Sequence, residues 1–434
     1  MVVEQSIKKI AIIGGGPSGM ASVKTLNTEK CDFDIDLYDS RANLGGIWNY
    51  FPTKSQYNDD HELVANDEYN HSPLYANLET NILYKSMEFT NFHFPEESVD
   101  FPFRTEVLDY LTKYSKTLGP YNKYLNTRVT GVEKNGDSWE LVSKNVVSGE
   151  VTTRLYDAVV VANGHFEVPR IPEVDGLDEW KKRDPKSITH AKFFDTPSRY
   201  KDKTVLVVGG IASGSDIAIQ SSATAKKVYV SCDETTILSN INNPFIEIIP
   251  RIESYDVNTR SVSFGGEKVS DIDEVIFCTG YLYDVPFLKL DICKKRYIQD
   301  LYRQMFYVQD PSLTFVGLGK DVSPFPFAEA QSSIIARYYS GRLKLPTSDE
   351  MKSVADEELK TKGDRLHGLK FPKEGEYING LFQLLEDRDL LDGFVFEKYE
   401  GERVERKKKV PEVKLKRVIN NNQRILDERG VFGI

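Results

Sequence analysis

Three glycines near the start of the chain have the spacing that can cradle a dinucleotide phosphate. Gly14, Gly16 and Gly19 form Gly-x-Gly-x-x-Gly directly after an apolar, strand-like run and before a helical stretch. The first glycine permits a tight turn, the second lets a pyrophosphate approach the backbone, and the third lets the helix pack on its strand. The start of that helix also offers unpaired N–H groups to the phosphates. The candidate phosphate site comprises Gly14, Gly16, Pro17, Ser18 and Gly19.

An acid and a tryptophan follow at positions that favour FAD in this first site. Asp39 comes after a second predicted strand, 20 residues beyond Gly19, where a carboxylate can accept hydrogen bonds from a ribose diol. A Gly-Gly-x-Trp stretch ending at Trp48 comes next, and this pattern is common among FAD-binding enzymes and lacking in most NAD dehydrogenases. The alternatives are a solvated carboxylate at Asp39 and a core aromatic residue at Trp48. The candidate residues here are Asp39, Arg41, Gly46, Ile47 and Trp48.

A second glycine-rich turn follows a second apolar run, at residues 209–214. Gly209 and Gly214 fit the same frame, but Ile211 takes the middle position, where a side chain would crowd a pyrophosphate. We interpret the turn as a pyridine-nucleotide site rather than an accidental turn, with Ser213 offering a hydroxyl contact. The candidate residues are Gly209, Ala212, Ser213 and Gly214. The next strand, 227–231, leads to Cys232, Asp233 and Glu234 instead of an arginine that could hold a 2′-phosphate, so these residues leave NADPH and NADH both open.

Composition and cysteine spacing exclude several classes of function. The 434 residues include 56 basic and 66 acidic side chains, a formal net charge of −10, which argues against nucleic acid as a partner. The four cysteines lie far apart, so neither a thiolate metal site nor a local redox dithiol is expected. The sequence contains no run of 18 apolar residues, so no transmembrane segment is expected. The expected compartment is the reducing cytoplasm.

The alternation of short apolar runs with longer amphipathic stretches predicts an α/β protein with two Rossmann-like dinucleotide-binding domains. The smaller domain is expected to be inserted into the larger. The predicted FAD-binding domain is discontinuous, 1–167 and 275–434, and the predicted NAD(P)H-binding domain is 168–274. Two such sites suggest that electrons pass from nicotinamide to flavin. Because no cysteine pair is available to receive them, the remaining common acceptor is O2.

Several longer stretches resemble the flavin-containing monooxygenases, most of all the compact fungal members, over nearly the whole chain. These stretches are 14–19, 45–48, 75–85, 101–104, 161–169, 277–283, 315–318 and 324–331. One departure concerns the family's identifying stretch, Phe-x-Gly-x-x-x-His-x-x-x-Phe/Tyr. Only His190 and Phe194 remain of it, while Asp184 and Lys186 stand where Phe and Gly are expected.

The resemblance implies a flavoprotein monooxygenase in which NADPH reduces FAD and O2 then forms a C4a-hydroperoxyflavin. The expected substrates are soft sulfur or nitrogen nucleophiles, including the small thiols expected of fungal relatives. Asn81 matches the asparagine beside flavin and nicotinamide and is the expected catalytic residue, its alternative being a turn-forming asparagine. The remaining matches are Thr80 beside Asn81, Ser72, Pro73 and Tyr281 in the nicotinamide pocket, Gln331 at a helix start near the flavin, and the Val129 backbone at the adenine.

Two other functions stay open at this stage, a Baeyer–Villiger monooxygenase acting on ketones and a non-catalytic flavin-binding sensor. His165 and His190 are expected to make local hydrogen bonds rather than act as bases. The basic run 403–417 is interpreted as a solvated helix face, with weak peripheral membrane contact as the alternative. A homodimer is also left open.

Overall fold

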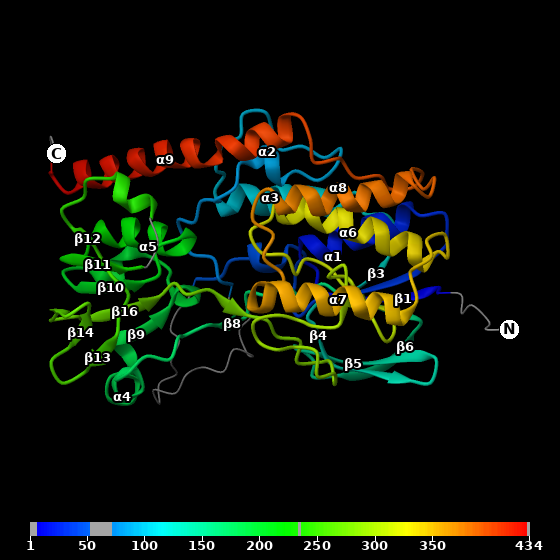
Figure 1. Ribbon diagram of the computed structural model, residues 1–434, viewed down its shortest axis with the longest axis horizontal. Coiled ribbons are helices and arrows are strands. Elements are labelled where there is room, and N and C mark those ends of the chain that lie inside the picture. Colours follow the sequence, from blue (N-terminus) through cyan, green and yellow to red (C-terminus); the bar gives the residue numbers. More distant parts are fainter. Residues whose placement is uncertain (1–6, 53–71, 233–235, 432–434) are drawn as a thin grey trace. The chain divides into compact units, whose positions relative to one another are not determined.

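A computed structural model describes residues 7–52, 72–232 and 236–431 (Figure 1). The chain forms two compact units. Unit 1 comprises Met1–Asn49, Ile82–Glu167 and Leu282–Lys408, and unit 2 comprises Tyr50–Asn81, Val168–Tyr281 and Lys409–Ile434. The smaller domain is expected at 168–274, whereas unit 2 extends to 281 and also takes two segments expected in the larger domain, 50–81 and 409–434.

Unit 1 is built on a seven-stranded sheet in the order β18-β19-β20-β7-β1-β2-β3. Its parallel strands are β1 (Lys9–Ile13), β2 (Asp34–Tyr38), β3 (Asn122–Tyr124), β7 (Ala158–Val161) and β20 (Leu313–Phe315). Two antiparallel strands, β18 (Leu301–Tyr302) and β19 (Phe306–Tyr307), extend one edge. The β7 residues are all apolar and buried, as expected for a central parallel strand covered on both faces.

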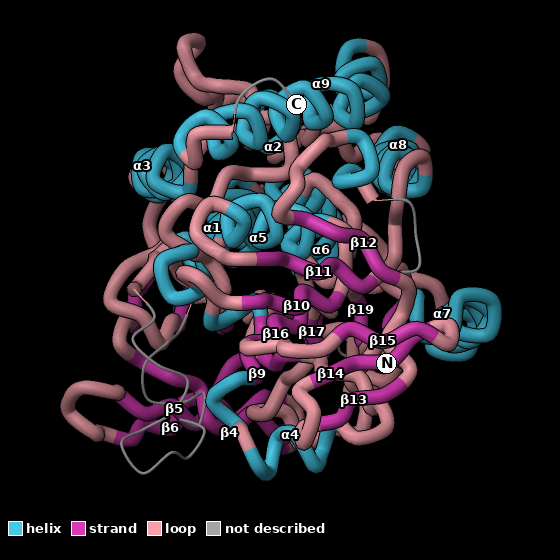
Figure 2. The backbone as a smooth tube through the Cα atoms, turned by 90° about the vertical axis from the view of Figure 1, so that its left-hand side faces the viewer, coloured by secondary structure: helices cyan, strands magenta, loops and turns pink. Residues whose placement is uncertain are grey.

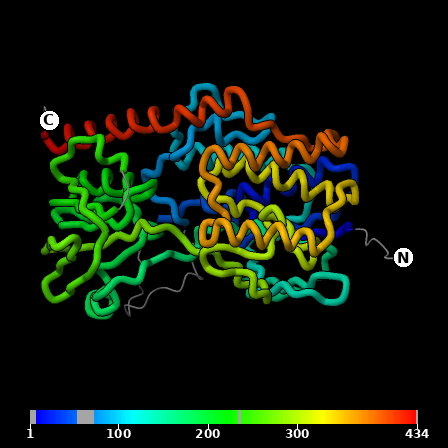
Figure 3. The backbone as a smooth tube through the Cα atoms, in the orientation of Figure 1, coloured from blue at the N-terminus to red at the C-terminus, as the bar shows by residue number. Residues whose placement is uncertain are grey.

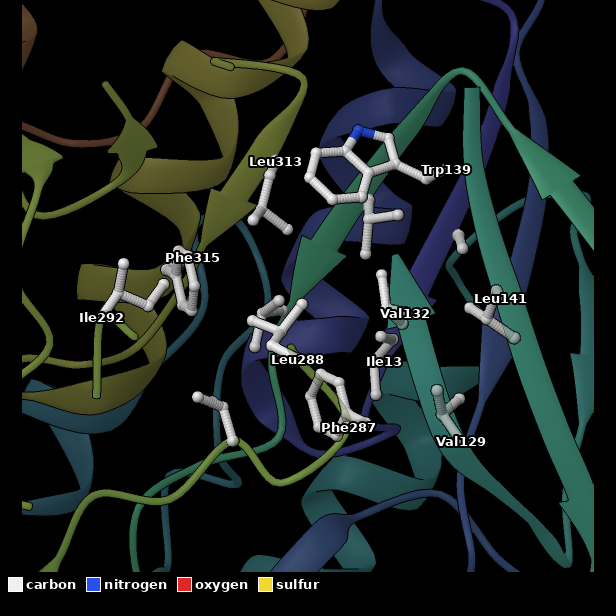
Figure 4. Packing of buried hydrophobic residues seen from close by; sticks show 14 of the residues in the cluster. Ile13, Val129, Val132, Trp139, Leu141, Phe287, Leu288, Ile292, Leu313 and Phe315 are labelled. Atoms are coloured by element: carbon white, nitrogen blue, oxygen red, sulfur yellow. The ribbon is translucent and has the colours of Figure 1, made fainter. Parts of the chain in front are cut away.

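A three-stranded antiparallel sheet packs against this parallel sheet and completes the core of unit 1. Its strands are β4 (Thr127–Asn135), β5 (Ser138–Asn145) and β6 (Val151–Tyr156). The side chains between the two sheets form one apolar cluster, seen from close by in Figure 4. The residues labelled there are Ile13, Val129, Val132, Trp139, Leu141, Phe287, Leu288, Ile292, Leu313 and Phe315.

Helices cover the parallel sheet of unit 1. They are α1 (Pro17–Thr28), α2 (Tyr84–Met87), α3 (Arg104–Ser115), α6 (Pro324–Tyr339), α7 (Ser348–Lys362), α8 (Lys373–Glu386) and the first residues of α9 (Glu402–Glu428). The α1 and α6 helices lie side by side, joined by a hydrogen bond of 3.0 Å between the Ser22 and Ser332 hydroxyls. Thr347 starts α7 through a capping box with Glu350, whose carboxylate accepts the Thr347 N–H.

Unit 2 contains a five-stranded, wholly parallel sheet in the order β12-β11-β10-β16-β9, with α5 beside it (Figure 2). The strands are β9 (Ile188–His190), β10 (Thr204–Val208), β11 (Lys227–Ser231), β12 (Ile246–Ile249) and β16 (Glu274–Phe277). The helices are α4 (Leu177–Arg183), α5 (Ala212–Ser222) and the part of α9 that begins at Lys409. An antiparallel sheet adds β13 (Ser254–Asp256), β14 (Ser261–Phe264) and β15 (Glu267–Val269), and β8 (Val168–Pro169) pairs with β17 (Tyr281–Leu282).

Short 3-10 helices fill several connections: η1 (Gly46–Trp48), η2 (Pro185–Ser187), η3 (Ala191–Phe193), η4 (Pro197–Tyr200), η5 (Ile237–Asn240) and η6 (Gly363–Arg365). The parallel sheets with their helices confirm the predicted α/β class. The core of unit 2 also explains its added segments. Tyr75 and Ile425, far outside the expected 168–274, are both buried in the apolar cluster around β10 and α5.

In both units a strand turns into a helix where the backbones touch. In unit 1 a Cβ added at Gly19 would overlap the carbonyl oxygen of Gly14, whose own φ is 111°. In unit 2 a Cβ at Gly214 would overlap the carbonyl oxygen of Gly209, whose φ is 107°. Neither overlap can be relieved by moving a side chain, because both partners are backbone. Glycine is therefore required at Gly19 and Gly214 by close approach, and at Gly14 and Gly209 by backbone conformation.

A buried carboxyl group lies among aromatic rings in the interior of unit 1. Glu329 on α6 is fully buried, accepting hydrogen bonds from the Thr90 N–H at 2.8 Å and the Tyr114 hydroxyl at 3.2 Å. Burial, as the largest cause, raises the pKa of Glu329 to about 8, while those two donors oppose the shift. Glu397 raises the pKa slightly, and Arg403 is the nearby cation.

We expect Gly19→Ala to lower the free energy of unfolding by on the order of 3 kcal/mol, because the new methyl group overlaps backbone. Gly380 in α8 is the matched control, since a Cβ there meets open space. Gly380→Ala is expected to be neutral or stabilising by about 0.5 to 1 kcal/mol. Urea unfolding followed by circular dichroism measures both. Similar effects of the two substitutions would contradict the close-approach argument.

We expect Glu329→Gln to remove part of the pH dependence of stability. The folded pKa lies above the unfolded value of 4.5, so the parent's protonated carboxyl stabilises the fold at low pH. That contribution is lost as the pH rises through about 8 and amounts to on the order of 3 to 5 kcal/mol. The variant should therefore be the more stable protein at alkaline pH and similar at acidic pH.

Thermal unfolding at about pH 4 and about pH 8.5 checks this, since the first value lies below the unfolded pKa and the second above the folded one. Glu376→Gln on α8 is the control, because Glu376 is exposed and in contact with solvent. If the stability of the parent and of Glu329→Gln changed with pH in parallel, burial of the ionised Glu329 carboxylate would not carry the assigned free-energy cost.

Candidate active site

The first glycine turn of unit 1 leaves the start of α1 without a side-chain cap. Gly16 is the residue before the helix and offers no side chain, and Pro17 has no N–H to satisfy. The amides of Ser18 and Gly19 therefore remain available for an anion at the positive end of the helix. Gly46 in η1 faces this turn, and a Cβ added at Gly16 would lie 3.5 Å from the Gly46 Cα. The turn and η1 thus present bare backbone to each other.

Asp39 and Arg41 lie at the carboxyl end of β2, next to the turn. The buried Asp39 carboxylate accepts hydrogen bonds from the Gly15 N–H and from the Arg41 N–H, each at 2.7 Å. Burial raises the pKa of Asp39, and the charge of Arg41 together with these two donors opposes the rise. A carboxylate has about four acceptor positions, so two remain for a ribose diol. The buried Nε of Arg41 has no hydrogen-bond partner within the described ranges, which suits a phosphate or ribose oxygen.

Gln331 supports the turn from the interior and lies at a different place in its helix than expected. The helix α6 begins at Pro324, whose fixed φ suits the first helical position, so the expectation of a helix start at Gln331 is wrong. The Gln331 amide is fully buried, accepts the Gly317 N–H at 2.9 Å and donates to the Tyr377 hydroxyl at 2.9 Å. A Cβ at Gly317 would meet the Ser18 hydroxyl, so Gln331 positions the loop that packs on the first turn of α1.

Val129 lies in β4, which begins beside the end of β2, because the Thr127 N–H donates to the Asp39 carbonyl at 2.8 Å. The pairing of β4 with β5 shifts register between Val129 and Gly131, which marks a β-bulge. Trp48 in η1 is buried and packs edge-on against Phe325 at 6.4 Å. Unit 1 therefore brings together the first-turn residues, Asp39, Arg41, the η1 residues and, through Gly317, Gln331.

The second glycine turn, in unit 2, has the same form as the first. Ile211 is the residue before α5 and gives no side-chain cap, so the amides of Ala212, Ser213 and Gly214 begin the helix uncapped. The Ile211 side chain does not fill the turn, because it is 72% exposed and its φ of −91° does not demand glycine. Asp233 and Glu234, considered above for nucleotide preference, lie outside the described residues.

The segment 72–81, which carries four of the expected site residues, belongs to unit 2. Ser72, Pro73 and Thr80 are buried, and the Ser72 hydroxyl accepts the Leu74 N–H at 3.2 Å. Asn81 ends the segment and is exposed, and its side chain makes no hydrogen bond with the described parts of the chain. The Asn81 amide is therefore not used by the fold of unit 2 and remains available for a ligand.

His190 holds the loop that contains Tyr281. Its Nε2 donates to the Gly280 carbonyl at 3.0 Å, its Nδ1 accepts the Lys192 N–H at 3.1 Å, and its ring packs edge-on against Tyr281 at 5.0 Å. Burial lowers the pKa of His190 to about 4 and that of His165 to about 3. Both rings are neutral at physiological pH. His190 makes the local hydrogen bonds expected of it, whereas the buried Nδ1 of His165 has no hydrogen-bond partner among the described residues.

Two residues of unit 2 received no role in the sequence analysis although the structure gives them one. The Tyr75 hydroxyl donates to the Asp216 carboxylate on α5. Asp216 lies two residues after the second glycine motif, and Tyr75 starts the stretch that leads to Asn81. An acid two residues behind a nucleotide turn was the available signal, but its partner lies 141 residues away and could not be identified from spacing.

Among residues 7–52, 72–232 and 236–431 no helix combines the length and apolarity needed to cross a bilayer.

Most basic side chains of the run on α9 form ion pairs. The ion pairs of the run are Arg406 with Glu402, Lys407 with Glu374, Lys408 with Glu405, Lys416 with Glu412, and Arg417 with Glu79.

Comparisons with known proteins agree over most of the chain. The model of the flavin-binding monooxygenase-like family matches residues 7–245 and 240–386. The chain is similar to a thiol-specific monooxygenase from Saccharomyces cerevisiae, with 33% identity over 397 residues that cover 87% of this chain and 85% of the relative. It is also similar to flavin-containing monooxygenase FMO GS-OX-like 2 from Arabidopsis thaliana, with 32% identity over 395 residues, 86% of this chain and 81% of the relative.

A solved structure gives the same result at the level of the whole fold. S-allyl-L-cysteine S-oxygenase from Allium sativum matches with a TM-score of 0.81 and 27% identity, covering 99% of each chain. The sequence, the two uncapped glycine turns and these relatives lead to one assignment. The chain belongs to the flavin-binding monooxygenase-like family, whose enzymes contain FAD and take electrons from NADPH.

Proposed function

We propose that this protein uses NADPH and O2 to oxygenate the sulfur atom of small thiols or thioethers. The observation that carries the proposal is the presence of two uncapped dinucleotide turns, one in each unit, in a chain whose relatives include a thiol-specific monooxygenase and an S-allyl-L-cysteine S-oxygenase. Unit 1 is proposed to hold FAD and unit 2 to hold NADPH. The donors and acceptors described above fit both cofactors.

In unit 1 the α1 amides would hold the FAD pyrophosphate, Asp39 the ribose hydroxyls, and the Val129 backbone the adenine. The free Nε of Arg41 supplies one further donor. In unit 2 the α5 amides would hold the NADPH pyrophosphate, while Ser72, Pro73 and Tyr281 would line the nicotinamide pocket. The exposed Ile211 leaves that turn unfilled, which argues against the non-catalytic sensor.

When bound, FAD supplies the redox chemistry, so that one atom of O2 enters the substrate and the other leaves as water. The balance is sulfur substrate, NADPH, a proton and O2 giving the S-oxygenated product, NADP+ and water. A thiol would leave as a sulfenic acid. The chain itself needs to bind and orient the cofactors and the substrate and to exclude water. It requires no acid–base triad. The neutral, hydrogen-bonded state of His190 agrees with this requirement.

Asn81 is proposed as the catalytic residue. Its amide can donate a hydrogen bond to the oxygen reactant or to the nicotinamide, and no partner within the described residues competes for it. An asparagine that merely formed a turn would bond to nearby backbone. The free and exposed amide therefore favours the catalytic interpretation.

A cytoplasmic location is proposed as well, because the four cysteines are free thiols and suit a reducing compartment. The basic run on α9 is proposed to be a solvated helix face, since ion pairs within the chain occupy most of its cations. Peripheral membrane contact is not favoured by this pairing.

Purified protein mixed with NADPH without oxygen is expected to lose its yellow flavin absorbance. In air, cysteine or S-allyl-L-cysteine should then yield S-oxygenated product in step with NADPH consumption, and cyclohexanone should yield no ester. Mass spectrometry of products alongside NADPH absorbance measures both. Ester formation would favour the Baeyer–Villiger alternative, and persistent yellow colour with both NADPH and NADH would favour the sensor.

Asn81→Ala is expected to keep FAD bound while the product formed per NADPH falls by about tenfold or more, because a donor to the reacting oxygen is lost. The missing electrons should appear as hydrogen peroxide. Asn77→Ala is the matched control, since Asn77 is exposed on the same segment. Equal coupling in parent and Asn81→Ala would remove Asn81 from the mechanism.

A further inference from the structure

The Asn81-bearing segment is held in unit 2 by a buried tyrosine. Tyr75 lies in the apolar core around β10 and α5, and its ring packs edge-on against Phe194 at 5.1 Å. Phe194 in turn stacks on Tyr200 at 5.8 Å. Phe194 is one of the two residues that remain of the family's identifying stretch, and its contact with Tyr75 gives it a structural role here.

The hydroxyl of Tyr75 connects this segment to the nucleotide helix. It donates to the carboxylate of Asp216, which is partly buried in the second turn of α5. Gln220, one turn further along α5, donates to Asp216 at 3.1 Å and to the Asn77 carbonyl at 3.3 Å. The first turn of the same helix carries the uncapped amides of Ala212–Gly214. One helix therefore contacts both the nucleotide turn and the Asn81 segment.

The charge of Asp216 makes this connection costly to break. Burial raises the pKa of Asp216 to about 6, so the group is mostly ionised at neutral pH, and the hydrogen bonds from Tyr75 and Gln220 oppose the rise. The cation of Lys414 on α9 also acts on Asp216, and Glu79 acts in the opposite sense. A desolvated carboxylate is destabilised when it loses a hydrogen-bond donor. This free-energy cost keeps the Tyr75 hydroxyl in place.

The other side of the segment is fixed to α9. Arg417 donates through Nε to Glu79 at 2.9 Å and makes a second bond through its terminal nitrogen, a bidentate pair. Asn421, one turn later, approaches the same carboxylate at 3.5 Å. Figure 3 separates the three pieces by colour, with the segment in light blue, the body of unit 2 in green and the end of α9 in red.

We propose that Tyr75 and Asp216, with Glu79 and Arg417 as a second attachment, are positioning residues that fix Asn81 relative to the nucleotide turn of α5. Binding of the nucleotide at that turn and placement of Asn81 then become coupled through one rigid helix. This inference rests on the proposed function, because it gives Asn81 its catalytic role.

The test uses the full-length, FAD-loaded protein and two readouts. Hydrogen–deuterium exchange of residues 74–81, whose Ala76 and Leu78 amides are bonded to Asp195 and Tyr75 carbonyls, reports placement of the segment. NADP+ should slow this exchange in the parent. Tyr75→Phe and Asp216→Asn should raise the exchange by about tenfold or more and abolish the slowing, as expected for one lost charged hydrogen bond. Product formed per NADPH should fall in the same variants.

Tyr200→Phe is the matched control, because the Tyr200 hydroxyl is buried in the same core and has no hydrogen-bond partner among the described residues. It should change neither readout. Arg417→Gln is a second variant that spares the core, since the Arg417 side chain is 40% exposed, and Lys416→Gln on the same helix is its control. Arg417→Gln should raise exchange in 74–81, and Lys416→Gln should not.

Faster exchange with unchanged coupling would mean that the contacts are only structural and would overturn the proposal. Unchanged exchange in Tyr75→Phe, Asp216→Asn and Arg417→Gln would overturn it as well. A parent protein that oxygenates no sulfur probe would refute the proposed function instead. In that case the NADP+-dependent protection of 74–81, and its loss in Asp216→Asn, still decides whether the helix connects nucleotide and segment.

Discussion

Both nucleotide turns depend on a place where backbone lies directly on backbone and no side chain fits. Gly19 meets the Gly14 carbonyl in unit 1, and Gly214 meets the Gly209 carbonyl in unit 2. This contact draws the first turn of each helix against its strand, so the uncapped amides point toward the space beyond the strand end. In unit 1, further candidate residues lie beside that contact. Asp39, for example, reaches the first turn by accepting the Gly15 N–H.

Each unit also contains a carboxyl group that accepts a hydrogen bond from a tyrosine hydroxyl, the fully buried Glu329 in unit 1 and the partly buried Asp216 in unit 2, and the two have different consequences. Glu329 lies beneath the aromatic rings of Tyr114 and Phe89, which stack at 3.8 Å, and it belongs to the body of unit 1. Asp216 joins two pieces of chain that are distant in sequence. A buried polar group forms few alternative contacts, so it fixes one arrangement more strictly than an apolar contact of similar size. In unit 2 the arrangement fixed in this way includes Asn81.

Local signals in the sequence were sufficient for the fold class and for the two turns. The predicted strand 227–231 matches β11 to the residue, because short apolar runs between turn residues are readable without tertiary information. The glycine spacing is equally local. The effect of Ile211 was harder to judge, since the direction of its side chain depends on the backbone angles at the start of α5. The family, the cofactors and the monooxygenase class follow from the comparisons, and the individual site roles stay predictions.

Long-range packing explains what the sequence could not provide. The membership of 50–81 in unit 2 rests on Tyr75 within a core formed by residues more than a hundred positions later. Gln331 was expected at a helix start, although Pro324 carried the local signal for the true one. The identifying stretch looked damaged by its two departures, yet His190 and Phe194 keep the contacts with Gly280 and Tyr75.

The division of α9 between the two units bears on how the protein is made. The segment that ends at Asn81 leaves the ribosome early, but its partner Arg417 follows 338 residues after Glu79. Ile425, in the core that surrounds Tyr75, emerges later still. Both sheets and both glycine turns are complete by then, so the strands of unit 2 can pair before segment 72–81 gains its contacts with α9. Among the described helices, α9 therefore completes the packing around the segment that carries the proposed catalytic residue.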